Sequence, residues 1–390
     1  MQGLAKDGGL FVPQEMPKLE KSLEDYAELS YQDLAYEIMK LYLTDFTEEE
    51  LRYCINSAYD DKFSTKEIAP VVKKGDSYYL ELFHGRTLAF KDMALSILPY
   101  LMKVSCKKNQ IQEKIVILTA TSGDTGKAAM EGFCDVDGCE IIVFYPKDGV
   151  SPFQERQMRA QKGQNTHVAA ILGNFDDAQS GVKKIFSDKA YQEKLLEKGY
   201  RLSSANSINI GRLVPQIVYY VYAYCRLMKS GELKAGESLN VSVPTGNFGN
   251  ILAAYCAKRM GLPLGKLLCA SNDNKVLTDF FRTGIYDKNR PFHVTTSPSM
   301  DILISSNLER LLYFAGENAE ECKKLMEELK DKGKYRISEA MEKELKDFYS
   351  GYGKEAEGSH SIFQTYKETG YVLDPHTAVA KVVADHYAYE

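Results

Sequence analysis

The residue with the clearest chemical potential is Lys91. An apolar strand over residues 78–83 leads into a short loop, 84–87, and the apolar spacing predicts a helix from about Ala89. Lys91 would then lie in the first turn, where the helix dipole disfavours an ammonium group. The helix end and partial burial would both lower the pKa of the amine and make it more reactive. A solvated lysine beside Asp92 is the ordinary alternative, and Lys91 by itself does not decide between them.

A glycine turn follows the next apolar strand. Residues 119–127 read Thr-Ala-Thr-Ser-Gly-Asp-Thr-Gly-Lys and precede a predicted helix. A strand, glycine loop and helix in this order present backbone N–H groups and a helix dipole to an anion. The turn is not a Walker A loop, because Thr121 and Ala128 occupy the diagnostic Gly and Ser/Thr positions. Local chemistry leaves two interpretations open, an anion site and a tight turn capped by Asp124.

A second glycine turn has the same layout. Residues 243–250 read Val-Pro-Thr-Gly-Asn-Phe-Gly-Asn between an apolar strand, 239–244, and a helix predicted from Ile251 to Met260. Glycine lets a backbone approach a phosphate closely, and asparagine tolerates left-handed conformations in such turns. A phosphate loop and a plain turn both fit these residues.

A third polar stretch, residues 203–212, reads Ser-Ser-Ala-Asn-Ser-Ile-Asn-Ile-Gly-Arg. Its hydroxyl and amide side chains, together with the fork of Arg212, could bind a second phosphate. The alternative is a cap for the tyrosine-rich helix predicted from about Val214 to Met228.

The composition is that of a folded protein with a large core. The chain has 390 residues, of which 44% are hydrophobic and 26% charged. A net charge of −5 does not favour a nucleic-acid surface. The first residues lack the apolar segment of a signal peptide, and no apolar run approaches the roughly 20 residues that span a bilayer. We expect a cytoplasmic protein without nucleic-acid or membrane partners.

Cysteine and histidine usage gives no metal motif. The eight cysteines include no CxxC pair, and the six histidines form no HExxH motif. We expect reduced thiols and no metal site.

Strands alternate with helices after residue 68. Apolar strands are predicted at 114–120, 141–145, 168–172 and 239–244, with helices between them. This alternation predicts a largely parallel sheet. Capped helices are predicted earlier, after Ser30 and Thr47, and residues 308–349 are charged and predicted to be helical.

Several of these stretches occur together, in order, in one known family. The segment 83–92, Phe-His-Gly-Arg-Thr-Leu-Ala-Phe-Lys-Asp, resembles the cofactor-lysine segment of threonine synthases, which are fold-type II pyridoxal-phosphate enzymes. Residues 3–13, 121–126, 204–212 and 246–250 are also similar to motifs of that family. The resemblance covers nearly the whole chain.

The chain departs from the family pattern at a few points. Arg86 stands where many members have proline, so the loop could be less stiff or Arg86 could meet an anion. Family members usually carry further residues before the opening motif and after the last helix, and we expect that the sequence is clipped at both ends. Segments 297–302 and 305–310 and His376 also look family-like, and we expect structural roles for them.

The resemblance implies an α/β fold of the tryptophan synthase β type, with mostly parallel sheets in a large and a small domain. The expected parts are a helical N-terminal part (1–66), a large cofactor-binding domain (67–92 and 213–390) and a small α/β domain (93–212).

The resemblance also implies roles for particular residues. Lys91 would be the catalytic residue and would bind pyridoxal 5′-phosphate covalently. The cofactor phosphate would be held by Gly246, Asn247, Phe248, Gly249 and Asn250. The substrate would be bound by Thr87, by Ser122, Asp124 and Thr125 near its carboxylate, and by Ser204, Asn206, Ser207, Asn209 and Arg212 near its phosphate.

The activity implied is that of a threonine synthase. This lyase of threonine biosynthesis converts O-phospho-L-homoserine and water to L-threonine and phosphate, and we expect a monomer or homodimer. Two alternatives stay open. One is a related phospho-lyase that releases 2-oxobutyrate, and the other is a catalytically silent binding protein of the same fold.

Overall fold

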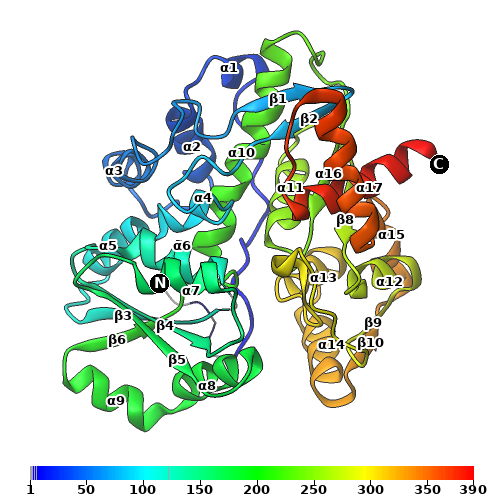
Figure 1. Ribbon diagram of the computed structural model, residues 1–390. Coiled ribbons are helices and arrows are strands. Elements are labelled where there is room, and N and C mark those ends of the chain that lie inside the picture. The colour runs from blue at the N-terminus through cyan, green and yellow to red at the C-terminus, as the bar shows by residue number, and fades with distance from the viewer. Residues whose placement is uncertain (1–2, 4, 6, 122) are drawn as a thin grey trace. The chain divides into compact units, whose positions relative to one another are not determined.

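The computed structural model describes residues 3, 5, 7–121 and 123–390, which fall into two units (Figure 1). The first unit comprises Met1–Phe11, Glu28–Pro70 and Leu80–Ala223. The second unit comprises Val12–Ala27, Val71–Tyr79 and Tyr224–Glu390. The division into N-terminal, large and small parts at residues 66, 92 and 212 stays a prediction.

The first unit contains a four-stranded parallel sheet in the order β5-β4-β3-β6. Its elements are α2 (Tyr31–Met39), α3 (Glu48–Ala58), α4 (Asp92–Leu95), α5 (Leu98–Lys108), β3 (Lys114–Ala120), α6 (Asp124–Phe133), β4 (Cys139–Pro146), α7 (Pro152–Arg159), β5 (Thr166–Ile171), α8 (Phe175–Ser187), α9 (Lys189–Glu197), β6 (Tyr200–Ser203) and most of α10 (Ile210–Lys229).

Both faces of this sheet are covered, as the continuous apolar strands predict. Ile115 and Ile117 of β3 belong to a buried cluster that includes residues of α5, α6 and α7. The alternate residues Val116 and Leu118 pack on the opposite face with Ala178 and other residues of α8. The two faces follow from the two-residue period of side chains along a strand.

The predicted helix starts at Ser30 and Thr47 are confirmed. Ser30 caps α2 by accepting a hydrogen bond from Asp33 N–H, and Thr47 forms a reciprocal capping box with Glu50 before α3. The tyrosine-rich helix is α10, which begins at Ile210 rather than Val214. Tyr31 of α2 packs edge-on against Tyr59 and Tyr222, with ring centroids 5.2 and 5.1 Å away.

The helix expected from Ala89 begins three residues later. Residues 89–91 form turns instead, in which Asp92 N–H donates to the Ala89 carbonyl and Met93 N–H donates to the Phe90 carbonyl, and α4 starts at Asp92. The helix is also short, because it ends at Leu95 and α5 begins at Leu98 with Pro99 in its first turn. Proline suits this position, because the first turn of a helix does not use its missing N–H group.

The second unit contains a three-stranded parallel sheet in the order β11-β8-β7. Its elements are α1 (Leu23–Ala27), β1 (Val71–Lys74), β2 (Ser77–Leu80, ending at the unit boundary), β7 (Leu239–Pro244), α11 (Gly249–Arg259), β8 (Leu264–Ser271), α12 (Val276–Thr283), β9 (Ile285–Asp287), a 3₁₀ turn at Pro298–Met300, α13 (Leu308–Gly316), α14 (Ala319–Lys332), β10 (Lys334–Arg336), α15 (Glu339–Glu344), β11 (Phe348–Tyr352), α16 (Glu355–Thr369) and α17 (Pro375–Tyr389).

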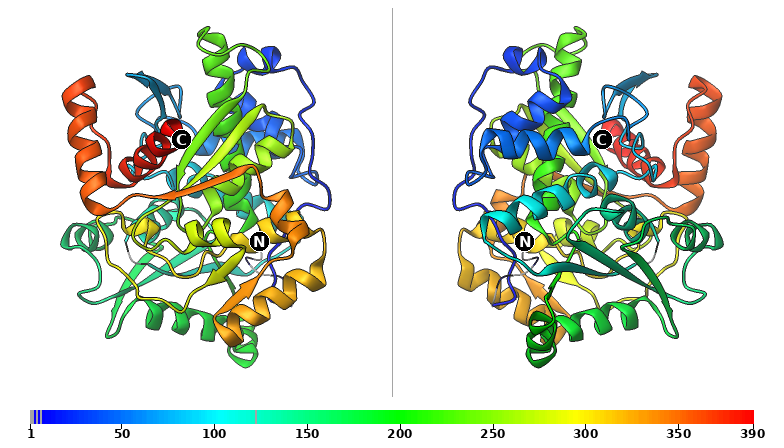
Figure 2. Two further views of the ribbon diagram at one scale, coloured as in Figure 1. Left: turned by 90° about the vertical axis from the view of Figure 1, so that its right-hand side faces the viewer. Right: turned by 90° about the vertical axis from the view of Figure 1, so that its left-hand side faces the viewer.

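Helices cover this sheet too, and Figure 2 shows the chain from two further sides. On one face, Leu268 and Ala270 of β8 pack with Val379 and Val383 of α17. Aromatic side chains of α11 and α12 contact Phe348 of β11.

Three strand assignments differ from expectation. The strand predicted over 78–83 is β2, which ends at Leu80, and Glu81 N–H then donates to the carbonyl of Pro70, the residue before its partner strand β1. Residues 308–349 were predicted to be helical, but they include β10 and the start of β11. These two strands form by pairing with β9 and β8, partners distant in sequence.

Candidate active site

Lys91 is buried, with 8% of its surface exposed. Its amine lies 3.5 Å from the Asp124 carboxylate and 4.9 Å from the centre of the Phe90 ring. Burial lowers the pKa of the Lys91 ammonium, Asp124 opposes that shift, and the positive charge of Arg212 adds to it. The lowered pKa was predicted, but its stated cause was partly wrong. Lys91 is the residue before α4, a single helical turn, and burial is the main cause.

The loop before Lys91 is fastened to Asp92. The N–H and hydroxyl groups of Thr87 donate to the Asp92 carboxylate at 2.8 and 2.6 Å. A side chain at Gly85 would come within 2.5 Å of the same carboxylate, so this loop can approach α4 only with glycine there. The hydroxyl proton of Thr87 is therefore committed to Asp92, and a contact with substrate through its oxygen stays a prediction.

Arg86, which departs from the family pattern, has a partner. Its guanidinium lies 3.2 Å from Glu131 of α6, and Lys127 lies 3.2 Å from the same carboxylate. Arg86 is thus tied to α6 at a site where its side chain stays 56% exposed. The partner of Arg86 is therefore a carboxylate of the same unit.

The first glycine turn is organised by Thr121. Its hydroxyl oxygen accepts from the N–H groups of Gly123 and Gly126, each at 2.9 Å. Asp124 and Thr125 follow in the first turn of α6, and Gln154 donates to Asp124 at 2.9 Å. The turn therefore directs Asp124 toward Lys91. Ser122, also predicted to bind substrate, lies outside the described residues.

Arg212 is the second buried cation of the first unit, with 3% of its surface exposed. One guanidinium nitrogen donates to the Ala205 carbonyl at 3.1 Å, while Nε is buried with no hydrogen-bond partner among the described residues. Burial lowers the pKa of Arg212 to about 10, so the guanidinium stays charged at neutral pH. The buried charge and the unpartnered N–H group favour an anion beside Arg212, and its contact with a substrate phosphate stays a prediction.

Some of the residues before Arg212 form hydrogen bonds with one another. Asn209 donates to the Ser204 carbonyl at 3.1 Å and accepts from Gly211 N–H at 3.0 Å. The Ser204 hydroxyl accepts from Asn206 N–H at 3.2 Å. These bonds shape the turn into α10, as the capping interpretation predicted, and Ser207 lies half-buried in the same turn. Their contacts with a substrate phosphate stay predictions.

The second unit carries the other glycine turn, residues 244–250, between β7 and α11. Phe248 has a φ of 63° and is buried against Phe281 and Phe348. A side chain at Gly246 would come within 2.2 Å of the Ser299 carbonyl oxygen, so this position requires glycine. Within the described part of the chain, no hydrogen bond from the N–H of Asn247, Phe248 or Gly249 to a protein atom is found.

Two carbonyl groups of this turn accept hydrogen bonds from a segment that begins 59 residues later. The Ser305 hydroxyl donates to the Gly246 carbonyl at 2.7 Å. The Asn307 side chain donates to the Asn247 carbonyl at 2.9 Å, and Asn307 N–H donates to the same oxygen at 3.1 Å. The segment was expected to be a turn and helix start, and the structure adds its contact with the glycine turn.

A second supporting network follows β8 and was not predicted. Asn272 donates to Asp301 at 2.7 Å and to Thr295 at 2.9 Å, and Asn274 donates to Asp301 at 3.1 Å. The signal available in the sequence was a run of polar residues directly after an apolar strand. His376 accepts from Ser299 N–H at 3.2 Å, which agrees with its predicted structural role.

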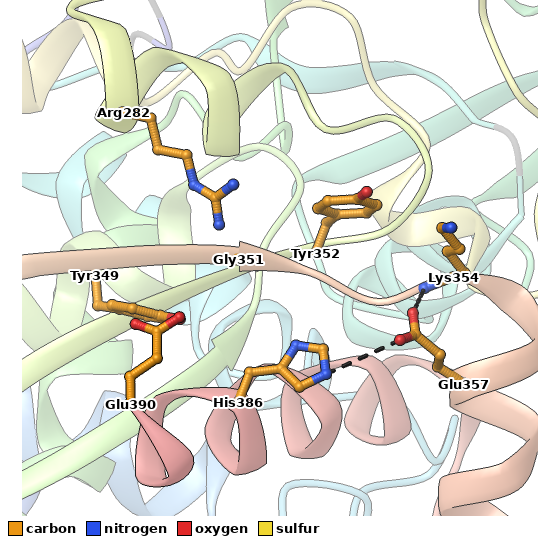
Figure 3. Close-up of a pocket in the computed structure, with 8 residues that line it drawn as sticks. All are labelled: Arg282, Tyr349, Gly351, Tyr352, Lys354, Glu357, His386 and Glu390. Carbon is orange, nitrogen blue, oxygen red and sulfur yellow. Dashed lines mark hydrogen bonds and ion pairs between the residues drawn. The ribbon is translucent and has the colours of Figure 1, made fainter.

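A separate pocket lies beside β11 in the second unit (Figure 3). It is lined by Arg282, Tyr349, Gly351, Tyr352, Lys354, Glu357, His386 and Glu390. The Glu357 carboxylate accepts from Lys354 N–H at 2.8 Å and lies 3.9 Å from His386 (Figure 3). These residues do not include those predicted to bind substrate or cofactor, and the pocket mixes both charge signs.

The fold is that of fold-type II pyridoxal-phosphate enzymes. The chain superposes on a pyridoxal-phosphate-dependent aspartate racemase with a TM-score of 0.51 at 14% identity, which shows a shared fold. The likeness to threonine synthases is much greater. The TM-score is 0.90 to the pyridoxal-phosphate-bound threonine synthase of Brucella melitensis, at 39% identity over 98% of this chain and 81% of that one. It is also 0.90 to the yeast threonine synthase, at 35% identity over 100% of this chain and 80% of the other.

Sequence comparison gives the same family. A family model described as the threonine synthase N terminus matches residues 1–59. The threonine synthase of Saccharomyces cerevisiae is 36% identical over 97% of this chain and 78% of its own length. The chain belongs to the threonine synthase family. It is also 43% identical to threonine synthase-like 1 of Pongo abelii, but it spans 53% of the length of that relative.

Proposed function

We propose that the protein is a threonine synthase, a pyridoxal-phosphate-dependent lyase that converts O-phospho-L-homoserine and water to L-threonine and phosphate. The observation that carries this proposal is the pair of buried cations in the first unit. Lys91 has a lowered pKa, and Arg212 keeps its charge without a carboxylate partner among the described residues. A reactive amine near a cationic anion site matches a substrate that carries both an amino acid and a phosphate group.

The residues present fit pyridoxal phosphate. A buried amine of lowered pKa suits covalent attachment of an aldehyde, and the turn 246–250 leaves N–H groups at the start of α11 for a phosphate. When bound, pyridoxal phosphate supplies an electron sink for the substrate carbons. We assign its covalent attachment to Lys91 and its phosphate to Gly246, Asn247, Phe248, Gly249 and Asn250.

The side chains of the first unit then have distinct tasks. Lys91, once its amine is free and neutral, accepts the proton from the substrate Cα and moves protons at Cβ and Cγ. Arg212 binds the phosphate that leaves Cγ, because a guanidinium fork matches phosphate geometry. The substrate phosphate is further assigned to Ser204, Asn206, Ser207 and Asn209, and the substrate carboxylate to Ser122, Asp124 and Thr125, with Thr87 beside them.

A second candidate activity is elimination of phosphate and ammonia from the same substrate, giving 2-oxobutyrate. The 43% identity to a relative named threonine synthase-like 1, whose length this chain spans only in part, keeps this activity under consideration. The two reactions share every residue named above and differ in whether water adds at Cβ.

Product analysis tests the proposal. Purified protein with added pyridoxal phosphate is incubated with O-phospho-L-homoserine, and threonine, phosphate, 2-oxobutyrate and ammonia are measured. We expect equal amounts of threonine and phosphate. Release of 2-oxobutyrate and ammonia would instead establish the phospho-lyase. A protein that forms no product and binds no cofactor would be a silent member of the fold.

Substitution of Lys91 tests the assignment of the cofactor, and substitution of Lys127 is the matched control. We expect Lys91→Ala to abolish the near-visible absorption of the bound cofactor and the trapping of cofactor by borohydride on this residue. Lys127→Ala, at a lysine of the same unit that pairs with Glu131, should keep both signals. Retention of the absorption band in Lys91→Ala would overturn the assignment of Lys91.

Three wider properties accompany the proposal. No helix among the described residues is long and apolar enough to cross a membrane. A cytoplasmic location and a monomeric or homodimeric state stay predictions. Light scattering of the purified protein measures the oligomeric state.

A further inference from the structure

Residues outside the proposed cofactor-phosphate turn hold two of its carbonyl groups. The carbonyl of Gly246 accepts from the Ser305 hydroxyl at 2.7 Å, and the carbonyl of Asn247 accepts from both Nδ2 and N–H of Asn307 at 2.9 and 3.1 Å. Ser305 is 6% exposed and Asn307 is fully buried. The turn is therefore fastened through its carbonyl groups to residues at the start of α13.

Arg310 fixes the orientation of the Asn307 amide. Its guanidinium donates to Oδ1 of Asn307, and Arg310 is itself almost fully buried in the first turn of α13. A guanidinium can only donate, so Oδ1 must face Arg310 and Nδ2 must face the Asn247 carbonyl. The Asn307 side chain cannot flip its amide without losing both bonds.

Holding a carbonyl also aims the next N–H group. In a trans peptide the C=O and the following N–H point in opposite directions, and the described residues contain no cis peptide. Fixing the Asn247 carbonyl toward Asn307 therefore turns the Phe248 N–H away from it. Fixing the Gly246 carbonyl does the same for the Asn247 N–H. These are two of the N–H groups that donate to no protein atom within the described part of the chain.

The positive charge of Arg310 also favours a phosphate at the turn. Burial lowers its pKa to about 10, so the guanidinium remains a cation at neutral pH on the carbonyl side of the turn. A cation in a region of low dielectric favours an anion nearby. A phosphate on the N–H side of the turn would be attracted by this cation as well as by the N–H groups.

We propose that Asn307 and Arg310 are positioning residues for the cofactor phosphate: Arg310 orients the Asn307 amide, which holds the Asn247 carbonyl and so directs the Phe248 N–H at the phosphate. The inference rests on the proposed function, which assigns the cofactor phosphate to the turn 246–250. It goes further by making the phosphate affinity depend on two residues that do not touch the phosphate.

The test compares pyridoxal phosphate with pyridoxal, which lacks the phosphate. Dissociation constants of both are measured by absorption titration for the wild type and for Asn307→Asp, which keeps the size of the side chain but loses the donor. We expect Asn307→Asp to weaken pyridoxal phosphate about tenfold, the effect of about one hydrogen bond, and to change pyridoxal less than about twofold. Arg310→Met should act alike, and Arg310→Lys, which can still donate to Oδ1, should recover part of the loss.

Asn289→Asp is the matched control. Asn289 belongs to the same unit and also donates its amide to a backbone carbonyl, that of Lys332 at 3.0 Å, but it does not contact the turn. It should leave both dissociation constants unchanged. If Asn307→Asp fails to fold by circular dichroism, Ser305→Ala takes its place, because it removes the donor to the Gly246 carbonyl.

The outcomes separate this inference from the proposed function. Equal weakening of pyridoxal phosphate and pyridoxal would make Asn307 a merely structural residue and overturn the inference. The inference would also be overturned if the wild type bound pyridoxal phosphate more tightly than pyridoxal and Asn307→Asp did not weaken the binding of pyridoxal phosphate. That result would leave the proposed function intact. A wild type that shows no Lys91-dependent absorption band would overturn both.

Discussion

The proposed anion sites of the two units differ in their physical basis. The first unit uses whole charges, because Arg212 is buried with an unsatisfied Nε and stands close enough to Lys91 to lower the pKa of its amine. The second unit uses backbone dipoles, because its glycine turn presents N–H groups whose opposite carbonyls are held by Ser305 and Asn307. Until a ligand arrives, a buried charge costs more stability than N–H groups that have no hydrogen-bond partner. We therefore expect that the charge in the first region lowers the stability of the ligand-free protein in order to bind an anion, and that the N–H groups of the second region do so less.

Arg212→Met is the sharpest way to break this comparison. We expect kcat/KM for O-phospho-L-homoserine to fall by about 30-fold or more, because losing a buried charged contact costs roughly 2–5 kcal/mol of binding. The same variant should unfold at a higher temperature in the absence of ligands, since it removes a desolvated charge. Steady-state kinetics and thermal melting measure the two effects. Arg212→Lys, which keeps the charge but loses the fork, serves as control, and a lower melting temperature in Arg212→Met would contradict the expected cost of the buried charge.

Gly246→Ala probes the second region. The added methyl group would meet the Ser299 carbonyl oxygen at 2.2 Å, a backbone atom that cannot move aside easily. We expect the free energy of unfolding to fall by roughly 1–3 kcal/mol and the affinity for pyridoxal phosphate to fall with it. Gly358→Ala in α16 is the control. Its methyl group has space, and alanine in a helix should add about 0.5–1 kcal/mol. An unchanged affinity in Gly246→Ala would show that the turn tolerates another shape.

Asp124→Asn tests the electrostatics around Lys91. The folded pKa of Lys91 lies below its ordinary value of 10.5, so the unfolded chain binds more protons between these two values. Stability should therefore rise with pH across that window. Asp124 raises the pKa of Lys91, and its removal should extend the window to lower pH. Unfolding of the cofactor-free protein by urea at a series of pH values measures this, with Lys91→Met as the variant that lacks the effect. An unchanged pH dependence would mean that Asp124 does not act on Lys91.

Arg86→Ala should have the smallest effect. The ion pair between Arg86 and Glu131 is exposed on the arginine side, and exposed ion pairs contribute about 0–1 kcal/mol. We expect a loss of stability in that range that disappears at high salt, measured by urea unfolding. A loss of several kcal/mol would show that Arg86 stiffens the loop before Lys91 far more than its exposure suggests.

The local features of this chain could be predicted from its sequence. β7 was predicted with the bounds Leu239–Pro244 that the structure has, because an apolar run ends at a proline and a glycine turn. The capping residues Ser30 and Thr47 act through neighbours three residues away. Such features depend on short stretches, which a single sequence contains in full.

The long-range hydrogen bonds that hold the site residues could not be predicted in this way. Asn307 holds the Asn247 carbonyl across 60 residues, and Asn272 meets Asp301 across 29. No periodicity or local motif encodes contacts of this kind. Burial was expected as one cause of the lowered pKa of Lys91, but its dominance over the helix end could not be predicted, since burial depends on the whole unit and not on the helix that Lys91 precedes.

The tyrosines around α10 have a practical consequence. The chain has 26 tyrosines and no tryptophan, so its intrinsic fluorescence comes from tyrosine. Burial raises the pKa of Tyr31, Tyr59 and Tyr219 well above the ordinary value of 10, and their phenols stay protonated where exposed tyrosines ionise. In mild alkali the folded protein would thus carry two spectroscopically distinct populations of ring. The change of the buried population to tyrosinate marks the opening of the first unit, which provides an optical signal for its unfolding without any attached dye.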